Sequence, residues 1–423
     1  MKKLKYFFIK VIFAFDSKQL HHWIIFCAVG EKMNKEILFC QFGGLGEKAI
    51  QETLKKMGYN VESFWVKAEN YDYDSGLLNR FVERMKKRKV DFVFSINFLP
   101  IISKVCNIFK TIYISWIYDS PELHLYSSAL KNSVNRIFLF DRMQYSRFYP
   151  VSPENIFYMP LATQPMSEKE MQEITRKEHQ LYDSEICFIG SLYNEKDKRF
   201  HELTKLPDYW KGYIQGIAEA QLNVFGYNFI ADSLTDQDVT ELRKLLEYEL
   251  VDDYQEVDRE IIADMYIGPM VSAMDRNRTV QRISENHKVT LYTGSDTRNF
   301  TNVENRGLAD SITMMPKIFH CSKINLNITS KTIQTGIPLR VFDVLGAGGF
   351  LITNYQQELM EYFEPGVDLV VYEDMDDLET KITYYLQHEE ERQQIALNGY
   401  HKVCQCYTYE IALREILMCV GIK

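Results

Sequence analysis

The sequence predicts an α/β protein with two domains, each built around a parallel sheet covered by helices. The chain has 423 residues, which is more than a single hydrophobic core usually supports. Short β-branched or aromatic runs alternate with amphipathic helical segments along most of its length. These runs lack strict polar alternation, as is typical of buried parallel strands.

Composition indicates a folded protein and argues against nucleic-acid binding. The chain is 46% hydrophobic and 13% aromatic, so it can bury a core. Its net charge is −9, and no concentrated basic face is visible along the sequence. Of the eight cysteines, no pair has zinc-ligand spacing, and Cys40, Cys187 and Cys321 lie in or beside apolar segments. We therefore expect a cytoplasmic protein without a metal site.

Residues 1–32 form an extension with two open interpretations. The stretch up to Phe15 is basic and rich in Phe and Ile, and a second apolar run covers 23–29. Neither run approaches the roughly 20 apolar residues that span a bilayer. One interpretation is an upstream start codon, with Met33 opening the protein. The other is an interfacial anchor that makes peripheral membrane contact, which fractionation with and without the extension would test.

The first domain is expected over residues 33–180 and opens with a βαβ pattern. A turn containing Gly43, Gly44 and Gly46 follows the first strand run, and an amphipathic helix follows the turn. The strand runs of this domain lie at residues 36–42, 60–66, 91–96, 111–118, 136–140 and 155–159.

The second domain is expected over residues 184–405, after a polar connector at 165–183. Residues from about 200 to 282 are rich in Leu, Glu and Lys and poor in strand signals, which predicts a mainly helical insertion. A C-terminal helix is expected within 406–423. Strand runs of this domain lie at 185–189, 288–292, 323–328, 350–353 and 369–372. Because ligands bind at the carboxyl ends of such strands, we expect the site in a cleft between the two sheets.

The most informative motif connects a strand to a short helix at Thr335-Gly336-Ile337-Pro338-Leu339-Arg340-Val341-Phe342-Asp343. Gly336 allows close approach of the backbone to a phosphate, and Pro338 is tolerated at the first turn of a helix. Arg340 carries a fork that fits phosphate oxygens, and Asp343, on about the same face, is a partner for ribose hydroxyls. The alternative is a capped core helix with a solvated Arg–Asp pair.

Residues 324 to about 414 resemble the C-terminal domain of glycosyltransferase-like proteins grouped with spore-maturation protein CgeB, in the GT-B superfamily. The resemblance rests on the motif above, with further stretches at 346–349, 351–353, 358–359, 362–366, 377–378, 399–400 and 408–409, and upstream at 115–121 and 188–193. It implies two Rossmann-like domains facing across a cleft, with the mainly helical insertion in the second.

The resemblance also implies an activity. It is metal-independent transfer of a sugar, of hexosyltransferase type, from a nucleotide-sugar donor to a protein, polysaccharide or lipid acceptor, without a cofactor. Similarity to retaining relatives favours retention of the anomeric configuration. The donor-binding residues that the resemblance assigns are Gly190, Lys196, Arg199, Gly336, Ile337, Pro338, Leu339, Arg340 and Asp343.

Two departures from the family pattern leave other functions open. Relatives have acidic residues on both sides of the Gly/Pro loop, whereas this chain has Thr335 at the first position and Asp343 at the second. Relatives often have an Arg after the glycine of the first C-terminal strand, whereas Ser191 follows Gly190, so Lys196 and Arg199 become the candidates for the leaving diphosphate. The alternatives are a non-catalytic component of a cell-surface or spore layer, or an epimerase-like enzyme on the same fold.

Asp119 and His124 are the candidate general bases in the first domain, with Thr335 as the third candidate catalytic residue. Asp119 follows the strand run at 111–118, so its carboxylate is expected at the cleft. The alternatives are a helix cap for Asp119 and a surface or packing role for His124. The turn of Gly43, Gly44 and Gly46 would let the backbone approach the donor phosphates or the acceptor.

Overall fold

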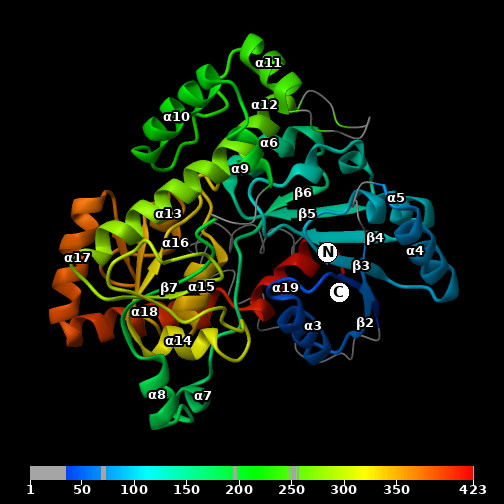
Figure 1. Ribbon diagram of the computed structural model, residues 1–423. Coiled ribbons are helices and arrows are strands. Elements are labelled where there is room, and N and C mark those ends of the chain that lie inside the picture. Colours follow the sequence, from blue (N-terminus) through cyan, green and yellow to red (C-terminus); the bar gives the residue numbers. More distant parts are fainter. Residues whose placement is uncertain are drawn as a thin grey trace, which may run out of the picture.

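The computed structural model describes residues 35–67, 73–193, 198–246, 248, 254 and 257–422. The extension at 1–32 and the candidate Lys196 lie outside these ranges. The described chain forms two α/β domains, each with a parallel sheet between helices (Figure 1). This confirms the predicted two-domain α/β architecture. Within these ranges, no helix is long and apolar enough to cross a membrane.

The N-terminal sheet has the strand order β2-β1-β3-β4-β5-β6. The order changes direction between β1 and β3, which is where α/β sheets bind ligands at their carboxyl ends. The strands are β1 Glu36–Gln41, β2 Asn60–Trp65, β3 Phe92–Ile96, β4 Ile112–Trp116, β5 Asn135–Leu139 and β6 Ile156–Tyr158. The connecting helices are α3 Glu47–Lys56, α4 Ser75–Lys87, α5 Pro100–Phe109 and α6 Arg142–Phe148, with the short 3-10 turns η1 Leu123–Tyr126, η2 Ser128–Lys131 and η3 Tyr149–Val151.

The C-terminal sheet has the order β12-β11-β10-β7-β8-β9, so its direction changes between β7 and β10. The strands are β7 Ser184–Ile189, β8 Val289–Tyr292, β9 Val303–Asn305, β10 Ser322–Asn327, β11 Leu351–Asn354 and β12 Val370–Tyr372. Sequence patterns missed β9, because its three residues are partly exposed or exposed and two of them are polar. The flanking helices are α14 Met315–Cys321, α15 Leu339–Gly346, α16 Leu359–Tyr362, α17 Met375–Gln387 and α18 Glu389–Cys406.

A helical layer lies between β7 and β8 in the chain and has its own apolar cluster. It occupies the top of the molecule in Figure 1. Its last helix, α13, directly precedes β8 and so forms the crossover to that strand. The elements are α9 Lys198–Leu203, α10 Asp208–Leu222, α11 Asp236–Leu246, α12 Asp258–Glu260, the π-helical turn η4 Ile261–Ile267 and α13 Gly268–Ser284.

The end of the chain returns to the N-terminal domain. Helix α19, Tyr409–Cys419, packs against α3, and Thr408 caps it by accepting from the Ile411 N–H (Figure 1). Thr163 exchanges backbone hydrogen bonds of 3.0 Å with Tyr407 and Tyr409. One apolar cluster therefore runs through both domains. The connector before β7 contains two short helices, α7 Glu168–Gln172 and α8 Arg176–Tyr182, each with a capping box.

Candidate functional site

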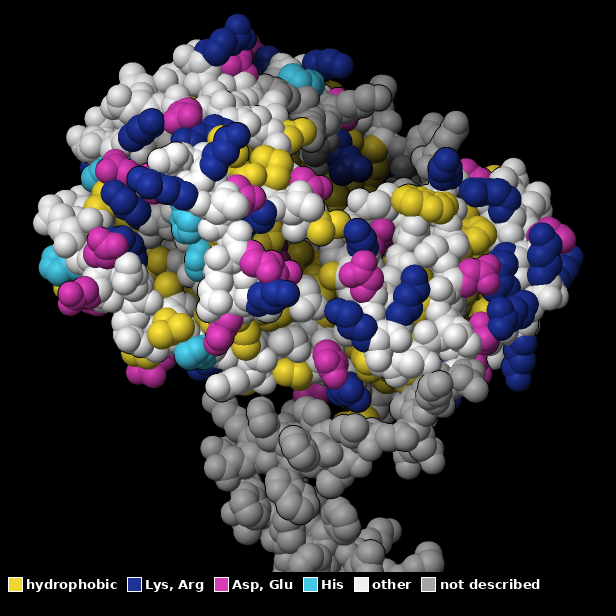
Figure 2. Space-filling model, turned by 90° about the horizontal axis from the view of Figure 1, so that it is seen from below, with side chains coloured by type: hydrophobic (Ala, Val, Ile, Leu, Met, Phe, Trp, Pro, Cys, Tyr) yellow, Lys and Arg dark blue, Asp and Glu magenta, His cyan; other side chains and the backbone are white. Residues whose placement is uncertain are grey.

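A cavity of about 980 Å³ opens between the two domains. Its walls come from the glycine turn and α3 of the N-terminal domain, from residues 163–173, and from α14 and α15 of the C-terminal domain. Lys48, Lys317, Glu52 and Glu170 are among the charged side chains that line it. Figure 2 shows the molecule from below, the side of α3 and α14, with side chains of both signs interspersed there. The domain boundary therefore holds a space large enough for a ligand of nucleotide size.

Helix α15 provides one wall of this cavity and carries both Arg340 and Asp343. Asp343 lines it together with Leu339, and its carboxylate lies 3.6 Å from the Arg340 guanidinium. The guanidinium also lies over the ring of Phe319, 5.1 Å from its centroid. Burial raises the pKa of Asp343 and lowers that of Arg340. The structure thus pairs the two residues, but of the two only Asp343 lines the cavity, and their roles toward phosphate and ribose stay predictions.

The loop before α15 contacts the N-terminal domain directly. A Cβ built on Gly336 would lie 2.9 Å from the Asp141 Cα and 2.9 Å from a ring carbon of Phe140, so only glycine fits. Ile337 is buried in the shared core, and Pro338 stands at the N-cap of α15. The close backbone approach predicted at Gly336 is therefore made to Asp141 in this structure.

Thr335 is buried at the same junction, where two carboxylates converge on its hydroxyl. Its Oγ1 lies 2.8 Å from Asp141 Oδ1 and 2.8 Å from Glu358 Oε1. Sequence reasoning missed both carboxylates. Asp141 follows the strand run at 136–140, which is the same signal that pointed to Asp119. Glu358 does not directly follow a strand run; it belongs to the stretch 358–359 of the family resemblance, which assigned it no role, and only the fold brings it to the junction.

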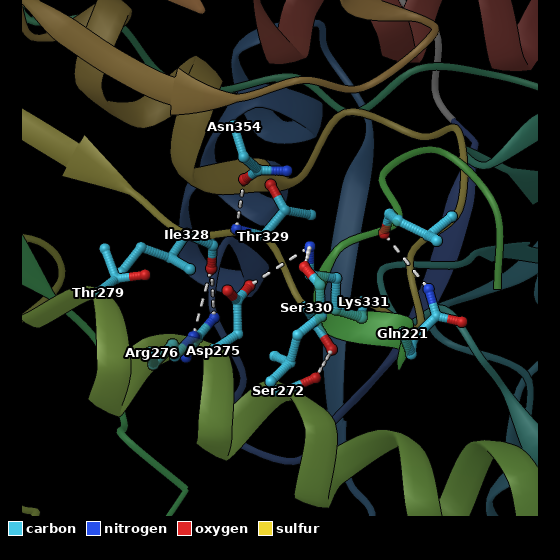
Figure 3. Close-up of polar contacts among 12 residues, drawn as sticks. Gln221, Ser272, Asp275, Arg276, Thr279, Ile328, Thr329, Ser330, Lys331 and Asn354 are labelled. Atoms are coloured by element: carbon cyan, nitrogen blue, oxygen red, sulfur yellow. Dashed lines mark hydrogen bonds and ion pairs between the residues drawn. The ribbon is translucent and has the colours of Figure 1, made fainter. Parts of the chain in front are cut away.

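Arg276 of α13 bridges the carboxyl ends of β7 and β10, where the C-terminal sheet changes direction. Its guanidinium donates at 2.7 Å to the carbonyl of Ser191. It also donates at 3.0 and 3.2 Å to the carbonyl of Ile328 (Figure 3). It also lies over the Tyr193 ring, 4.4 Å from the centroid. A Cβ on Gly190 would lie 3.7 Å from the guanidinium. A cation therefore occupies the position at which α/β folds bind anionic ligands.

Lys331 places a second cation at these strand ends (Figure 3). Its side chain is only 4% exposed and lies 3.8 Å from the Asp275 carboxylate and 3.3 Å from the Phe225 ring centroid. Burial lowers the pKa of Lys331 and raises that of Asp275. The loop is fixed by Ser330, whose Oγ lies 2.7 Å from that of Ser272, and by the Thr329 N–H, which donates to Asn354 at 2.7 Å.

The sequence carried a signal for Arg276 that went unused. Ser272, Arg276 and Thr279 recur at helical spacing, and Ser272 and Thr279 are buried in α13. A buried polar stripe of this kind marks a helix that contacts polar backbone or a ligand. Of the residues predicted for the diphosphate, Gly190 lies beside Arg276, whereas Arg199 on α9 contacts the sulfur of Met265 at 3.5 Å.

Asp119 lies just beyond β4, at the carboxyl end of the N-terminal sheet. Its carboxylate accepts a hydrogen bond of 2.6 Å from Asn97, so it does not cap a helix. Burial of the carboxyl group, followed by the charge of Glu122, raises its pKa to about 6. His124 is close enough to affect this pKa, and its Nδ1 lies 2.6 Å from Glu122. The structure therefore brings Asp119 and His124 close together around Glu122, and their base role stays a prediction.

In the glycine turn, the carboxylate of Glu47 is bonded to backbone N–H groups of the turn itself. The Glu47 carboxylate accepts from the backbone N–H of Phe42 at 3.0 Å and of Gly43 at 2.9 Å. Gly46 has a positive φ of 80°, and a Cβ there would lie 2.7 Å from the Tyr409 hydroxyl. Gly44 and Gly46 line the cavity, while the N–H groups of Phe42 and Gly43 are already bonded to Glu47.

Comparison with known proteins supports the fold and part of the family resemblance. Residues 276–418, roughly a third of the chain, match a protein family described as glycosyl transferase-like. HepE from Anabaena, solved in complex with UDP and glucose, is 12% identical, with 92% of this chain and 100% of that chain covered and a TM-score of 0.51. This likeness shows the GT-B fold and nothing about the ligand.

Two other solved structures are more distant. A glycosyltransferase from Rickettsia africae is 10% identical, covers 92% of this chain and 100% of its own, and has a TM-score of 0.49. Sucrose-phosphate synthase from Thermosynechococcus elongatus is 12% identical, with 92% and 99% covered and a TM-score of 0.48. No curated protein matches the sequence.

Proposed function

We propose that this protein is a glycosyltransferase that moves a sugar from a nucleotide-sugar donor to an acceptor held by the N-terminal domain. One observation carries the proposal. The region similar to glycosyl transferases, residues 276–418, supplies both cations at the strand ends, Arg276 and Lys331, and the cavity wall that contains Asp343.

The chemistry of these groups suits the departure of a nucleoside diphosphate. Charge accumulates on the diphosphate as the glycosidic bond breaks, and fixed cations in a water-poor cleft stabilise that charge. Arg276 is held by two backbone carbonyls, so it needs no reorientation when the charge develops. Asp343 would accept from ribose hydroxyls, and Asp119 would accept the proton of an acceptor hydroxyl.

Finer assignments belong to the same proposal and rest on the sequence resemblance. They are membership of the CgeB-like group, transfer of a hexose, retention of configuration and a cytoplasmic enzyme acting on an envelope component, with peripheral membrane contact as an open alternative. Proton NMR of the product, which distinguishes α- from β-linked anomers, would test retention.

Titration calorimetry with UDP, GDP, ADP and their glucose conjugates, followed by an assay for donor hydrolysis, tests the main proposal. Binding of one nucleotide series with slow hydrolysis of its conjugate is the expected result. Failure of every nucleotide to bind would contradict the proposal.

A second function, a non-catalytic GT-B-fold component, is favoured by the junction around Thr335. The position expected to face the donor sugar holds a hydroxyl that is already bonded to Asp141 and Glu358, and Gly336 is in contact with Asp141. Nucleotide binding without any turnover would select this function over the first.

A further inference from the structure

Glu358 is a buried carboxylate at the domain boundary to which the mechanism above gives no role. It lies between β11 and α16 and is 1% exposed. Three donors surround it: Thr335 Oγ1 and the Arg142 N–H at 2.8 Å each, and the Tyr158 hydroxyl at 2.5 Å. Burying a carboxylate is costly unless such donors replace its water, so the position needs an explanation.

Thr335 and Glu358 form one unit on the C-terminal domain. Besides the side-chain contact, the Glu358 N–H donates to the Thr335 carbonyl at 3.2 Å. The two residues follow β10 and β11, which are neighbouring parallel strands in register. Movement of the N-terminal domain would therefore leave Thr335 and Glu358 together.

The remaining donors to Glu358 come from the other domain. The Arg142 N–H begins helix α6, and Tyr158 ends strand β6. They present one N–H and one O–H to the carboxylate, and two neighbouring sugar hydroxyls could supply the same number of donors through their O–H groups. A sugar that entered between the domains could replace both without leaving the carboxylate unpaired.

The Thr335 hydroxyl also contacts a carboxylate of the other domain, Asp141, which in addition accepts from the Gln334 N–H at 3.0 Å. The Thr335 hydroxyl has one proton and cannot donate to Asp141 and Glu358 at the same time. Burial also raises the pKa of Glu358, and the nearby Asp141 charge adds to this effect. Two carboxyl groups at one hydroxyl thus oppose each other, and separating the Asp141 side relieves that opposition.

We propose that Glu358 is the carboxylate that binds hydroxyl groups of the transferred sugar, with Thr335 positioning it, and that Arg142 and Tyr158 occupy its place until a donor enters. The inference rests on the proposed function. In this inference, Glu358 takes the role of the acidic residue that relatives have at the position of Thr335.

The test compares a nucleotide with its sugar conjugate in the full-length protein. UDP, GDP, ADP and their glucose conjugates serve as probes, with Glu358→Gln as the variant. Glu361→Gln is the matched control, because Glu361 lies in α16 and its carboxylate bonds only the exposed end of Arg142. We expect Glu358→Gln to raise KM for the glucose conjugate at least tenfold while the Kd of the free nucleotide changes less than twofold. Glu361→Gln should change neither.

A second variant keeps the inference testable if Glu358→Gln folds poorly. Tyr158→Phe removes one competing donor, so the KM for the glucose conjugate should fall. Unchanged KM in both Glu358→Gln and Tyr158→Phe, or equal losses for nucleotide and conjugate, would overturn the inference and leave the proposed function standing. Failure of the wild-type protein to bind any nucleotide would overturn both.

Discussion

Thr163 donates a hydrogen bond of 2.9 Å to Asp343, although 180 positions separate the two residues. Thr163 lies where the chain leaves the N-terminal sheet and is itself held by the backbone of Tyr407 and Tyr409. Asp343 is thereby fixed from the opposite domain, at the cavity wall that it shares with Leu339. Its carboxylate is the group on which the proposed ribose contact depends.

Replacing Asp343 by Asn should weaken nucleotide binding about tenfold, the equivalent of about 1.4 kcal/mol, because a neutral amide is a poorer acceptor for ribose hydroxyls. Titration calorimetry measures the change. Thr163→Val is the matched control. It removes the hydrogen bond and lowers the free energy of unfolding by about 0.5–1.5 kcal/mol, but leaves the carboxylate in place. Equal losses of affinity in both variants would assign Asp343 to structure alone.

Replacing Arg276 by Ala should weaken binding of a nucleoside diphosphate and destabilise the protein by about 1–3 kcal/mol, because the carbonyls of Ser191 and Ile328 lose their donor. Urea unfolding and calorimetry measure the two effects. Arg278→Ala, in the same helix, removes only a surface ion pair with Glu219, so Tm and affinity should stay unchanged. Wild-type affinity in a folded Arg276→Ala protein would rule out the diphosphate role.

Turnover should rise with pH around 6 if Asp119 is the general base. Its raised pKa of about 6 leaves the carboxyl group protonated, and unable to accept a proton, below that value. The free energy of unfolding should change with pH in the opposite direction to turnover. The neutral form is favoured in the folded state, so the contribution of Asp119 is full at low pH and is lost as pH rises through 6.

A profile of kcat against pH from 5 to 8 measures this limb, which Asp119→Asn should abolish. Asp264 provides the control, because burial raises its pKa to about 6 as well. If Asp264→Asn abolished the rise of kcat near pH 6 and Asp119→Asn did not, the titrating group would be Asp264 and not Asp119.

Replacing Gly336 by Ala should force the loop away from Asp141 and cost about 1–3 kcal/mol, because the new methyl group would lie 2.9 Å from the Asp141 backbone. Thermal unfolding measures the loss, and small-angle scattering would detect separation of the domains. Gly212→Ala is the control. Position 212 lies in α10 with open space around it, so alanine should stabilise by about 0.5–1 kcal/mol. If Gly336→Ala and Gly212→Ala changed Tm equally, the close contact between Gly336 and Asp141 would be contradicted.

Sequence patterns predicted the strands well because each has a local cause. The run at 36–42 is mostly apolar over the length of a buried strand and corresponds to β1, and the run at 323–328 has Ile or Leu at every second position and corresponds to β10. β9 lacked that signal. The motif at 335–343 likewise predicted a loop and a short helix, since proline and glycine constrain the backbone locally.

Local patterns were enough to predict two parallel α/β sheets and to place Arg340 and Asp343 on one helix, because periodicity and helix-start signals act over a few residues. The meeting of Asp141, Thr335 and Glu358, and the bridge that Arg276 makes between β7 and β10, depend on how the chain packs in three dimensions. Those contacts link residues tens to hundreds of positions apart, and no local pattern records the packing of one domain against the other.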